Sequence, residues 1–385
     1  MSGVENESVH VEQVGCGCQP GEQTDAQGGD GAFDAVLACY FEPRADGSPS
    51  WSLTRGPSGM NNTTRYVAHA SGRFILRIYE THRDGDKVAY EHHVLACLRQ
   101  APLAGLPVPE PVSALGGGSI VRSPDGKLAA LFRHREGRNP VLVTPADFLD
   151  FGLSAGSLSR AMAAIAPDRE PLYRPYYEHG LTTPGEIRQH LIGPLRQAGS
   201  GLEDLGEALD VVEAGLIDLH RRVPALQALP HQLIHGDLNA SNVLADAYNR
   251  IVALLDFEFV AWDLRVMELA VCLSEALPPP DAPMAEDGWA CLSALIRGFT
   301  ARVPLLDEEA AVLPELLQLR RLDVFLHFLH RWRDGVDSLA HVRRFLLEAR
   351  EQARWLARNG ERLACLARLR AGSPAGPPGM EGEHP

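Results

Sequence analysis

The stretch His231–Ala270 reads HQLIHGDLNASNVLADAYNRIVALLDFEFVAWDLRVMELA, and the rest of the chain is organised around it. It contains two short apolar runs, Gln232–Ile234 and Ile251–Leu255, which have the length and composition of buried strands. A carboxylate follows each run: Asp237 lies shortly after the first and Asp256 directly after the second. Two buried strands that each end at an Asp predict a metal site.

Asn242 lies between these carboxylates, in the spacing Asp-x-x-x-x-Asn followed by a later Asp-Phe. Phosphoryl transfer to an alcohol needs a carboxylate near the attacking hydroxyl and oxygen ligands for the Mg²⁺ that binds the ATP phosphates. Asp237 would supply the first, and Asn242 and Asp256 the second. The same spacing occurs in the protein-kinase catalytic loop and metal motif. Here, however, the loop begins His235-Gly236-Asp237, and Glu258 follows Asp256-Phe257.

With these differences the stretch resembles the superfamily of aminoglycoside phosphotransferases, choline kinases and type II homoserine kinases, which phosphorylate small molecules with a kinase-like fold. The resemblance implies that Asp237 is the catalytic carboxylate and that Asn242 and Asp256 are the Mg²⁺ ligands. Each residue by itself could equally cap a strand end, but the ordered set favours the site. In this family an Asp-Leu-Ala braces the catalytic loop, and Glu268-Leu269-Ala270 stands at that place.

The bulk composition is that of a globular enzyme. The chain has 385 residues, of which 45% are apolar, so two or three ordinary domains with a sizeable core are expected. A net charge of −14 argues against binding of nucleic acid or anionic lipid, because both need a basic surface. No run of 18 apolar residues occurs, and the N-terminus lacks a signal-peptide pattern. We therefore expect a cytoplasmic protein without a membrane segment.

The seven cysteines form neither a disulfide framework nor a zinc pattern. Most of them look like small buried apolar residues. Cys16 and Cys18 lie in a polar N-terminal segment, where they are either a reactive pair or functionless, and the sequence leaves both open.

Residues 1–31 lack periodicity and predict a disordered tail, and residues 32–136 predict an ATP-binding lobe. A short helix is expected over 32–41 and another from Asp84 or Asp86 to Gln100. Alternating and β-prone runs predict a five-stranded antiparallel sheet. Its strands are expected at Trp51–Arg55, Thr63–Ala68, Phe74–Tyr79, Ile120–Arg122 and Leu128–His134.

The loop Gly56-Pro-Ser-Gly-Met-Asn-Asn62 is either an ordinary hairpin loop or a phosphate-binding loop. In a kinase-like lobe it would cover the ATP phosphates, where glycine lets backbone N–H groups approach. Under that interpretation the ATP-site residues are Ser58, Gly59, Asn61 and Asn62.

Kinase-like folds pair a cation on the third strand with a Glu on the next helix. The resemblance implies that Arg77 and Glu91 hold these positions, since neither Lys87 nor Lys127 falls on that strand. Arginine keeps the charge but grips phosphate with a different geometry from lysine. The alternative is a surface ion pair. The segment Leu131–Gly137 resembles the hinge between the lobes.

Residues 137–371 predict a helical catalytic and acceptor-binding lobe, and residues 372–385 a second disordered tail. Arginines recur in the last two predicted helices, 308–333 and 336–358, and Arg320 and Arg321 are among them. We interpret them as solvated helix faces rather than an anion-binding surface. By position alone, Glu258, Asp263 and the tyrosines near Tyr176 are candidates to meet a cationic acceptor.

The predicted fold is therefore a bilobed, protein-kinase-like α+β structure. The predicted function is ATP- and Mg²⁺-dependent transfer of the γ-phosphate to a hydroxyl of a small molecule that is homoserine-, amino-alcohol-, sugar- or aminoglycoside-like. A protein kinase is an alternative, but no Ala-Pro-Glu follows Asp256. A second alternative is a catalytically silent relative that binds a nucleotide or metabolite. It stays open because Arg77 stands where the family usually has lysine. The sequence decides neither the acceptor nor whether the protein is a monomer or a homodimer.

Overall fold

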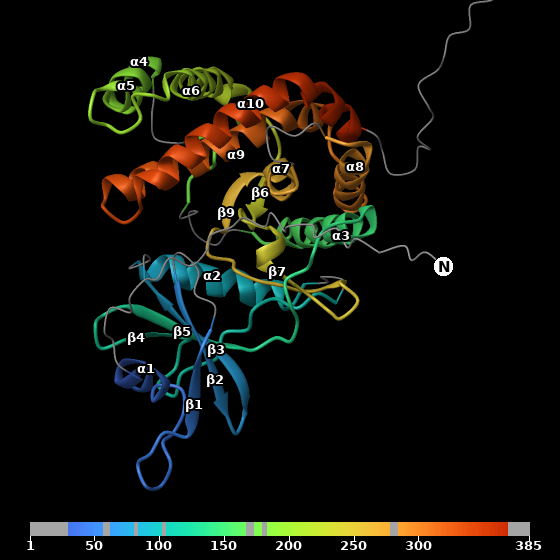
Figure 1. Cartoon of the computed structure of the whole chain (residues 1–385). Coiled ribbons are helices and arrows are strands. Elements are labelled where there is room, and N and C mark those ends of the chain that lie inside the picture. Colours follow the sequence, from blue (N-terminus) through green and yellow to red (C-terminus); the bar gives the residue numbers. More distant parts are fainter. Residues whose placement is uncertain are drawn as a thin grey trace, which may run out of the picture.

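A sheet lobe and a helical lobe follow one another along the chain (Figure 1). The computed structural model describes residues 30–56, 62–80, 84–101, 105–166, 173–178, 183–277 and 284–368. The predicted tails, Cys16 and Cys18, and the loop residues Ser58, Gly59 and Asn61 therefore lie outside the described residues, apart from the first tail's last two positions.

The sheet lobe is the predicted five-stranded antiparallel sheet, with strand order β1-β2-β3-β5-β4. Successive side chains of β3 pack on opposite faces of the sheet. Phe74, Leu76 and Ile78 pack with the first helix, whereas Tyr79 packs on the side of α2. Arg77 shares the face of Tyr79 because side chains alternate along a strand. The strands are β1 (Trp51–Arg55), β2 (Asn62–His69), β3 (Gly72–Tyr79), β4 (Ile120–Arg122) and β5 (Leu128–Arg133); the helices are α1 (Asp30–Leu37) and α2 (Gly85–Leu98).

The helix α2 starts where the sequence predicts. Asp84 is its N-cap, and its side chain accepts a hydrogen bond from the backbone N–H of Asp86 at 2.9 Å. The cap satisfies one of the free N–H groups of the first turn. This start places Glu91 in the buried middle of the helix, facing the sheet.

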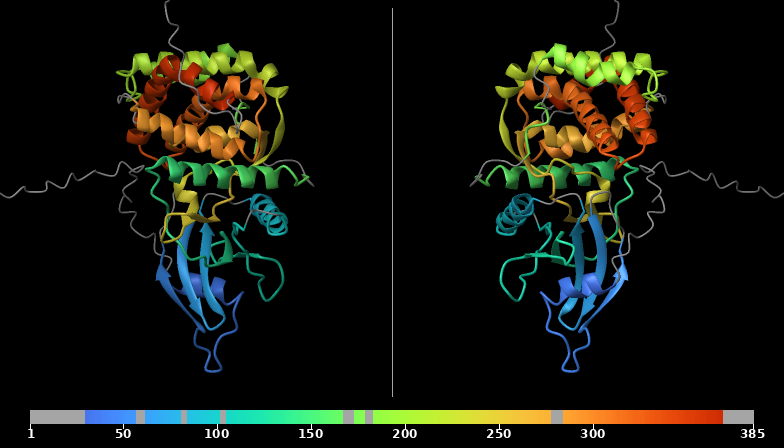
Figure 2. Two further views of the ribbon diagram at one scale, coloured as in Figure 1. Left: turned by 90° about the vertical axis from the view of Figure 1, so that its right-hand side faces the viewer. Right: turned by 90° about the vertical axis from the view of Figure 1, so that its left-hand side faces the viewer.

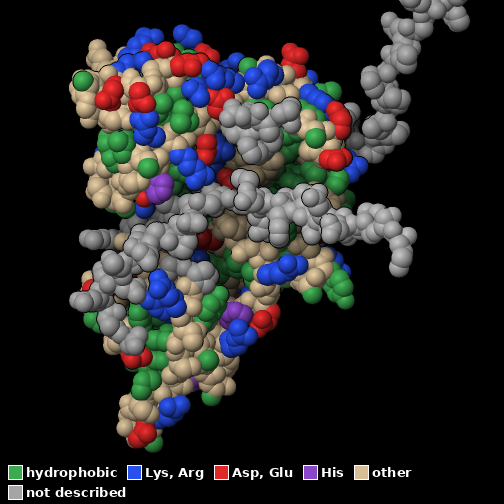
Figure 3. Space-filling model, viewed as in Figure 1, with side chains coloured by type: hydrophobic (Ala, Val, Ile, Leu, Met, Phe, Trp, Pro, Cys, Tyr) green, Lys and Arg blue, Asp and Glu red, His purple; other side chains and the backbone are tan. Residues whose placement is uncertain are grey.

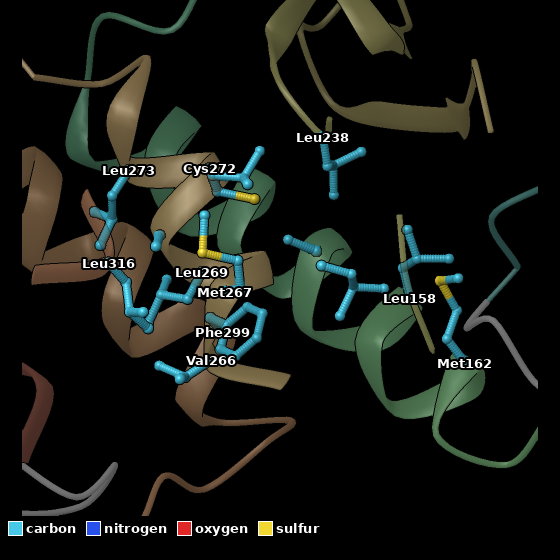
Figure 4. Close-up of a cluster of buried hydrophobic side chains, with 14 of the residues drawn as sticks. Leu158, Met162, Leu238, Val266, Met267, Leu269, Cys272, Leu273, Phe299 and Leu316 are labelled. Carbon is cyan, nitrogen blue, oxygen red and sulfur yellow. The ribbon is translucent and has the colours of Figure 1, made fainter. Parts of the chain in front are cut away.

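The helical lobe packs around α3, which runs along the side that faces the sheet lobe (Figure 2). The side chains of α3, α7, α8 and α9 form one apolar core, in which Leu158, Met267, Phe299 and Leu316 take part (Figure 4). A second cluster joins α6, α9 and α10. The helices are α3 (Pro145–Met162), α4 (Pro184–Glu186), the π-helix η1 (Ile187–Ile192), α5 (Gly193–Arg196), α6 (Gly206–Gln227), α7 (Arg265–Ser274), α8 (Glu286–Thr300), α9 (Asp307–Arg333) and α10 (Leu339–Arg368).

Glycines allow α3 and α8 to approach closely. A Cβ atom on Gly152 would lie 2.2 Å from the carbonyl oxygen of Leu295, and one on Gly298 would lie 2.5 Å from that of Leu149. The helices therefore pack backbone against backbone, which no larger residue would permit.

Two small antiparallel ladders include the predicted strands of His231–Ala270: β6 and β9 lie beside α7 in the helical lobe, and β7 lies at the side of the sheet lobe (Figure 1). β6 (His231–Ile234) pairs with β9 (Ala261–Leu264), and β7 (Val243–Ala245) pairs with β8 (Ile251–Leu254). A 3-10 turn, η2 (Ala240–Asn242), precedes β7. Asp237 therefore follows β6 and Asp256 follows β8, at the junction between the lobes.

Two surface observations complete the fold. Basic and acidic side chains are interspersed over the helical lobe on the face shown in Figure 3. In the described part of the chain, no helix has the length and apolarity needed to cross a membrane.

Candidate functional site

His235 organises the loop that carries Asp237. Its ring is buried, and Nε2 lies 2.8 Å from the carbonyl oxygen of Leu255. The backbone N–H of Asp237 donates to Nδ1 of the same ring at 3.3 Å. Since Nδ1 accepts, Nε2 carries the proton and donates to Leu255. One neutral imidazole thus joins the loop after β6 to the end of β8.

Gly236 and Glu268 fix the path of this loop. Gly236 has φ 79°, and a Cβ atom there would lie 2.7 Å from the carbonyl oxygen of Phe259. Only glycine adopts this backbone conformation without strain. Glu268 of α7 is buried and accepts the backbone N–H of His235 at 2.5 Å. It therefore contacts the loop at the place that the resemblance assigns to a bracing Asp.

Asn242 holds Asp237 in place. Its Nδ2 donates to the backbone carbonyl of Asp237 at 2.7 Å and to Oδ2 of its carboxylate at 3.0 Å. Burial raises the pKa of the Asp237 carboxyl to about 6, and Arg320 opposes that rise while Asp256 and Glu275 add to it. Asp237 is therefore a stronger base than an exposed aspartate and is still ionised at neutral pH.

Asp256 lies beside Asn242, because Leu255 donates its backbone N–H to the carbonyl oxygen of Asn242 at 2.8 Å. Its φ of 59° is in the left-handed region, which is uncommon for a residue other than glycine and costs energy. Its Oδ1 lies 3.3 Å from Nη1 of Arg77 and is buried without a hydrogen bond from any described residue.

These groups fit a divalent cation that also binds phosphate. Asn242 uses its amide nitrogen on Asp237, so its amide oxygen is the atom left for a metal, and Asp256 adds a carboxylate. Among the described residues, no group of three or more His, Cys, Asp or Glu side chains could hold a metal. A site with two protein ligands suits Mg²⁺, which usually keeps waters and takes phosphate oxygens.

Arg77 and Glu91 form the predicted ion pair, with Nη1 and Oε1 3.3 Å apart. The pair is not on the surface, since the two side chains are 16% and 3% exposed. Burial raises the pKa of Glu91 to about 7, against the effect of Arg77. Burial also disfavours the charge of Arg77, but Asp256 and Glu91 outweigh it and raise the pKa of the guanidinium. Arg77 therefore links Glu91 of α2 to Asp256, the candidate metal ligand.

Asn62 contacts the catalytic stretch directly. Its Nδ2 donates to Oε2 of the buried Glu258 at 2.8 Å, which connects the start of β2 to the residue after Asp256-Phe257. That Glu258 meets a cationic acceptor stays a prediction; in the structure its side chain is buried and bound to Asn62.

A cavity of about 330 Å³ lies beside the predicted hinge. Its lining includes Ser52, Thr54 and Tyr66 of the sheet and His134, Glu136 and Gly137 after β5. Gly137 lies against β7, where a Cβ atom would be 2.8 Å from Cβ of Leu244. The cavity therefore has one wall on the sheet lobe and an edge at the crossing between the lobes.

Sequence reasoning missed the role of Arg320. This residue of α9 is only 15% exposed, and its Nη2 lies 2.6 Å from Oδ1 of Asp237. Its Nη1 donates to the hydroxyl of Tyr176 at 3.0 Å, and that hydroxyl donates to the carbonyl of Gly236. The expectation of solvated helix faces is therefore wrong for Arg320, because α9 packs directly on the catalytic loop. No signal in the sequence distinguishes it from the neighbouring arginines.

Asp263 also differs from the expectation. It is fully buried and accepts the backbone N–H groups of Tyr176 and Leu264, each at 2.6 Å. Burial raises the pKa of its carboxyl to about 7, against these two hydrogen bonds. Asp263 therefore positions the segment of Tyr176 and does not face an acceptor.

Comparisons with known proteins identify the family and the fold of the chain. The model of the phosphotransferase enzyme family matches residues 52–302. A homoserine kinase of Gluconacetobacter diazotrophicus is 26% identical over 326 residues, which cover 82% of this chain and 94% of that protein. Curated homoserine kinases of other bacteria match at similar identity.

Solved structures show the same fold at lower identity. A microcompartment-associated aminopropanol kinase superposes with a TM-score of 0.60 at 20% identity, over 87% of this chain and 99% of that one. An amicoumacin kinase in complex with AMP-PNP, Ca²⁺ and Ami gives 0.60 at 17% identity, over 83% and 92%. These likenesses confirm the predicted bilobed, kinase-like architecture.

Proposed function

Since the chain belongs to the phosphotransferase enzyme family and is a kinase of small molecules, we propose that it phosphorylates the hydroxyl of a homoserine-like amino alcohol. The donor is ATP, and the divalent metal is Mg²⁺. One set of contacts supports this proposal most directly. The backbone of Leu255 hydrogen-bonds both the ring of His235 and the carbonyl oxygen of Asn242, and Arg77 forms an ion pair with the next residue, Asp256. The homoserine kinases that match most of the chain support the acceptor class.

Asp237 orients the acceptor hydroxyl and takes its proton. As the hydroxyl oxygen bonds to the γ-phosphorus, the bond from that phosphorus to the β-phosphate oxygen of ATP breaks, and ADP leaves. A pKa of about 6 suits this role, because the carboxylate is ionised at neutral pH yet basic enough to accept a proton late in the transfer. The bonds from Asn242 keep its Oδ2 in place.

Asn242 and Asp256 would hold the metal, which when bound neutralises charge on the β- and γ-phosphates. Arg77 would bind phosphate oxygens of the nucleotide. A guanidinium has five N–H donors, and the two ion pairs of Arg77 both run through Nη1, so donors remain for the nucleotide. Glu91 and Asp256 hold the guanidinium in position.

The test is ATP consumption by the full chain with Mg²⁺ and a panel of homoserine, amino alcohols, choline, sugars and aminoglycosides. ADP release and the mass of the phosphorylated product are measured. We expect the highest kcat/KM with homoserine-like acceptors. A protein that releases ADP only with sugars or aminoglycosides would contradict the acceptor class and leave the phosphotransfer intact.

Asp237→Ala should lower kcat by roughly 10²- to 10⁴-fold, the usual contribution of a positioned acid or base, with ATP affinity nearly unchanged. Asp218→Ala is the matched control, because that carboxylate is 68% exposed on α6 and ion-pairs only with Arg221 among the described residues. Wild-type turnover in the Asp237 variant would overturn the assignment.

A further inference from the structure

Arg320 and Asn242 each bind one carboxylate oxygen of Asp237, so both oxygens have a donor before any acceptor is bound. Oδ1 of Asp237 takes the hydrogen bond from Arg320 at 2.6 Å, and Oδ2 takes that from Asn242 at 3.0 Å. The hydrogen bond from Asn242 to Oδ2 is compatible with catalysis, because it orients the carboxylate and leaves Oδ1 for the acceptor hydroxyl. The bond through Arg320 competes with the hydroxyl, because a charge-assisted hydrogen bond occupies the basic atom and lowers its proton affinity.

On the guanidinium edge of Arg320 that suits a carboxylate, only one of the two N–H groups has an acceptor. Nη1 serves the Tyr176 hydroxyl at 3.0 Å and Oδ2 of Asp323 at 3.4 Å. Nη2 donates to Oδ1 of Asp237, whereas Nε is buried and has no hydrogen-bond acceptor among the described residues. Nε and Nη2 together are the edge that binds a carboxylate through two parallel bonds. Asp237 contributes one oxygen to this edge, so a second acceptor oxygen is missing.

A buried N–H donor without an acceptor carries a free-energy cost, because the hydrogen bond that it made to water is not replaced. A ligand carboxylate that bound both Nε and Nη2 would remove that cost. It would also replace the single bond to Asp237. The ring of Tyr176 lies against the guanidinium, since Cζ of Arg320 lies 5.5 Å from that ring centre.

The carboxylates around Arg320 complement a cation. Asp323 lies one turn along α9 and Glu275 caps the C-terminal end of α7 with an exposed side chain. Glu275 acts electrostatically on both Asp237 and Arg320. One guanidinium on Asp237, with Asp323 bound to it and Glu275 within its electrostatic reach, matches a zwitterion that carries a carboxylate and an ammonium group.

We infer that Arg320 binds the α-carboxylate of an amino-acid acceptor, and that this binding releases Oδ1 of Asp237 for the acceptor hydroxyl. Glu275 and Asp323 receive the ammonium group. This inference rests on the proposed function, which it extends by making the acceptor a hydroxy amino acid. Asp237 stays paired with Arg320 until the acceptor arrives, which also limits transfer of phosphate to water.

Three acceptors test the inference with wild type and Arg320→Gln: homoserine, 3-amino-1-propanol, which lacks the carboxylate, and 4-hydroxybutanoate, which lacks the ammonium group. Each analogue keeps the spacing of homoserine between the hydroxyl and its remaining charged group. For wild type we expect homoserine to be best and 3-amino-1-propanol to be poorest in kcat/KM. Arg320→Gln should lose roughly 10- to 150-fold with homoserine, mostly in KM, which corresponds to a charge-assisted pair of about 1.5–3 kcal/mol. The ratio of kcat/KM for homoserine to that for 3-amino-1-propanol should fall by a similar factor.

Arg321→Gln is the matched control. Its side chain is 18% exposed, close to that of Arg320, but it binds Glu348 and Gln352 of α10 instead of the catalytic loop. A general loss of packing in α9 would lower turnover of all acceptors together, so the acceptor ratio in this control should stay at the wild-type value.

Two results overturn the inference. If wild type uses homoserine but Arg320→Gln loses activity equally with all three acceptors, Arg320 does not bind the carboxylate and the proposed function stands. If wild type uses none of the three but phosphorylates carboxylate-free hydroxyl compounds, both the role of Arg320 and the homoserine-like acceptor are wrong.

Discussion

Gly236→Ala adds one methyl group next to the catalytic aspartate, and the structure predicts its cost. Gly236 has φ 79°, a conformation in which an L-residue loses about 1–2 kcal/mol. The new Cβ would lie 2.7 Å from the carbonyl oxygen of Phe259, and that oxygen belongs to the backbone. Overpacking of this kind costs about 1–3 kcal/mol. The free energy of unfolding should therefore fall by roughly 2–5 kcal/mol.

The catalytic loss should exceed the loss expected from instability. Relief of the clash moves the loop between β6 and η2, and with it the carboxylate of Asp237. A displacement of about 1 Å in a reacting group lowers the rate by roughly 100-fold. We expect kcat to fall by about that factor in the folded fraction of the variant, measured with saturating ATP and acceptor below its melting temperature.

Gly126→Ala separates the two contributions. Gly126 has φ 84°, but a Cβ atom there would have no neighbour within 4 Å, and it lies in the turn before β5. This variant should lose only the conformational cost of about 1–2 kcal/mol and keep the wild-type kcat. A Gly236→Ala enzyme with kcat within about threefold of wild type would refute the placement of the loop by Phe259.

Three further predictions concern stability and the nucleotide side. Burial raises the pKa of Asp263 from its ordinary 3.8 to about 7, so the folded protein keeps a proton that the unfolded chain releases between these values. The free energy of unfolding of wild type should fall relative to Asp263→Asn as the pH rises through this window, by up to ~1.4 kcal/mol per pH unit in urea titrations. Gly152→Ala should cost about 3 kcal/mol or more, since α3 and α8 must separate, whereas Gly85→Ala at the open start of α2 should gain up to about 1 kcal/mol, both measured by denaturation. Asn62→Ala removes the bond to Glu258 across the lobes and should raise KM for ATP about 10-fold while KM for the acceptor stays the same in initial-rate assays.

Each of these has a clear contrary result. A pH-independent difference between wild type and Asp263→Asn would mean that the carboxyl is ionised in the fold throughout the window. Equal stability of the two glycine variants would contradict the close approach of α3 and α8. An unchanged KM for ATP in Asn62→Ala would remove the interlobe bond from nucleotide binding.

Much of the fold could be predicted, because local patterns are strong in this chain. The five strands of the sheet lobe and the start of α2 at Asp84 follow from alternation and capping, which act over a few residues. The strand β9 was missed because its four residues carry no pattern of their own and pair only through β6, 30 residues earlier in the chain.

Local sequence patterns likewise indicate some of the candidate site residues but not others. The short spacing within His231–Ala270 makes Asp237, Asn242 and Asp256 recognisable, and the hairpin of β7 and β8 brings Asn242 beside the residue that precedes Asp256. The pair of Arg77 and Glu91 follows from strand and helix order. Nothing local marks Arg320, which lies 83 residues beyond Asp237 and resembles the other arginines of α9.

The amino-acid sequence by itself determined the order of the lobes and singled out Asp237, Asn242 and Asp256 as candidate site residues, since these depend on local periodicity and spacing. Only the tertiary structure decided which charges face one another: it buried Asp263 and Glu258, which had looked available to a ligand, and placed Arg320 on Asp237. The physical reason is that burial and pairing are set by which helix packs on which loop. A side chain's neighbours come from segments whose separation in sequence carries no information about their separation in space.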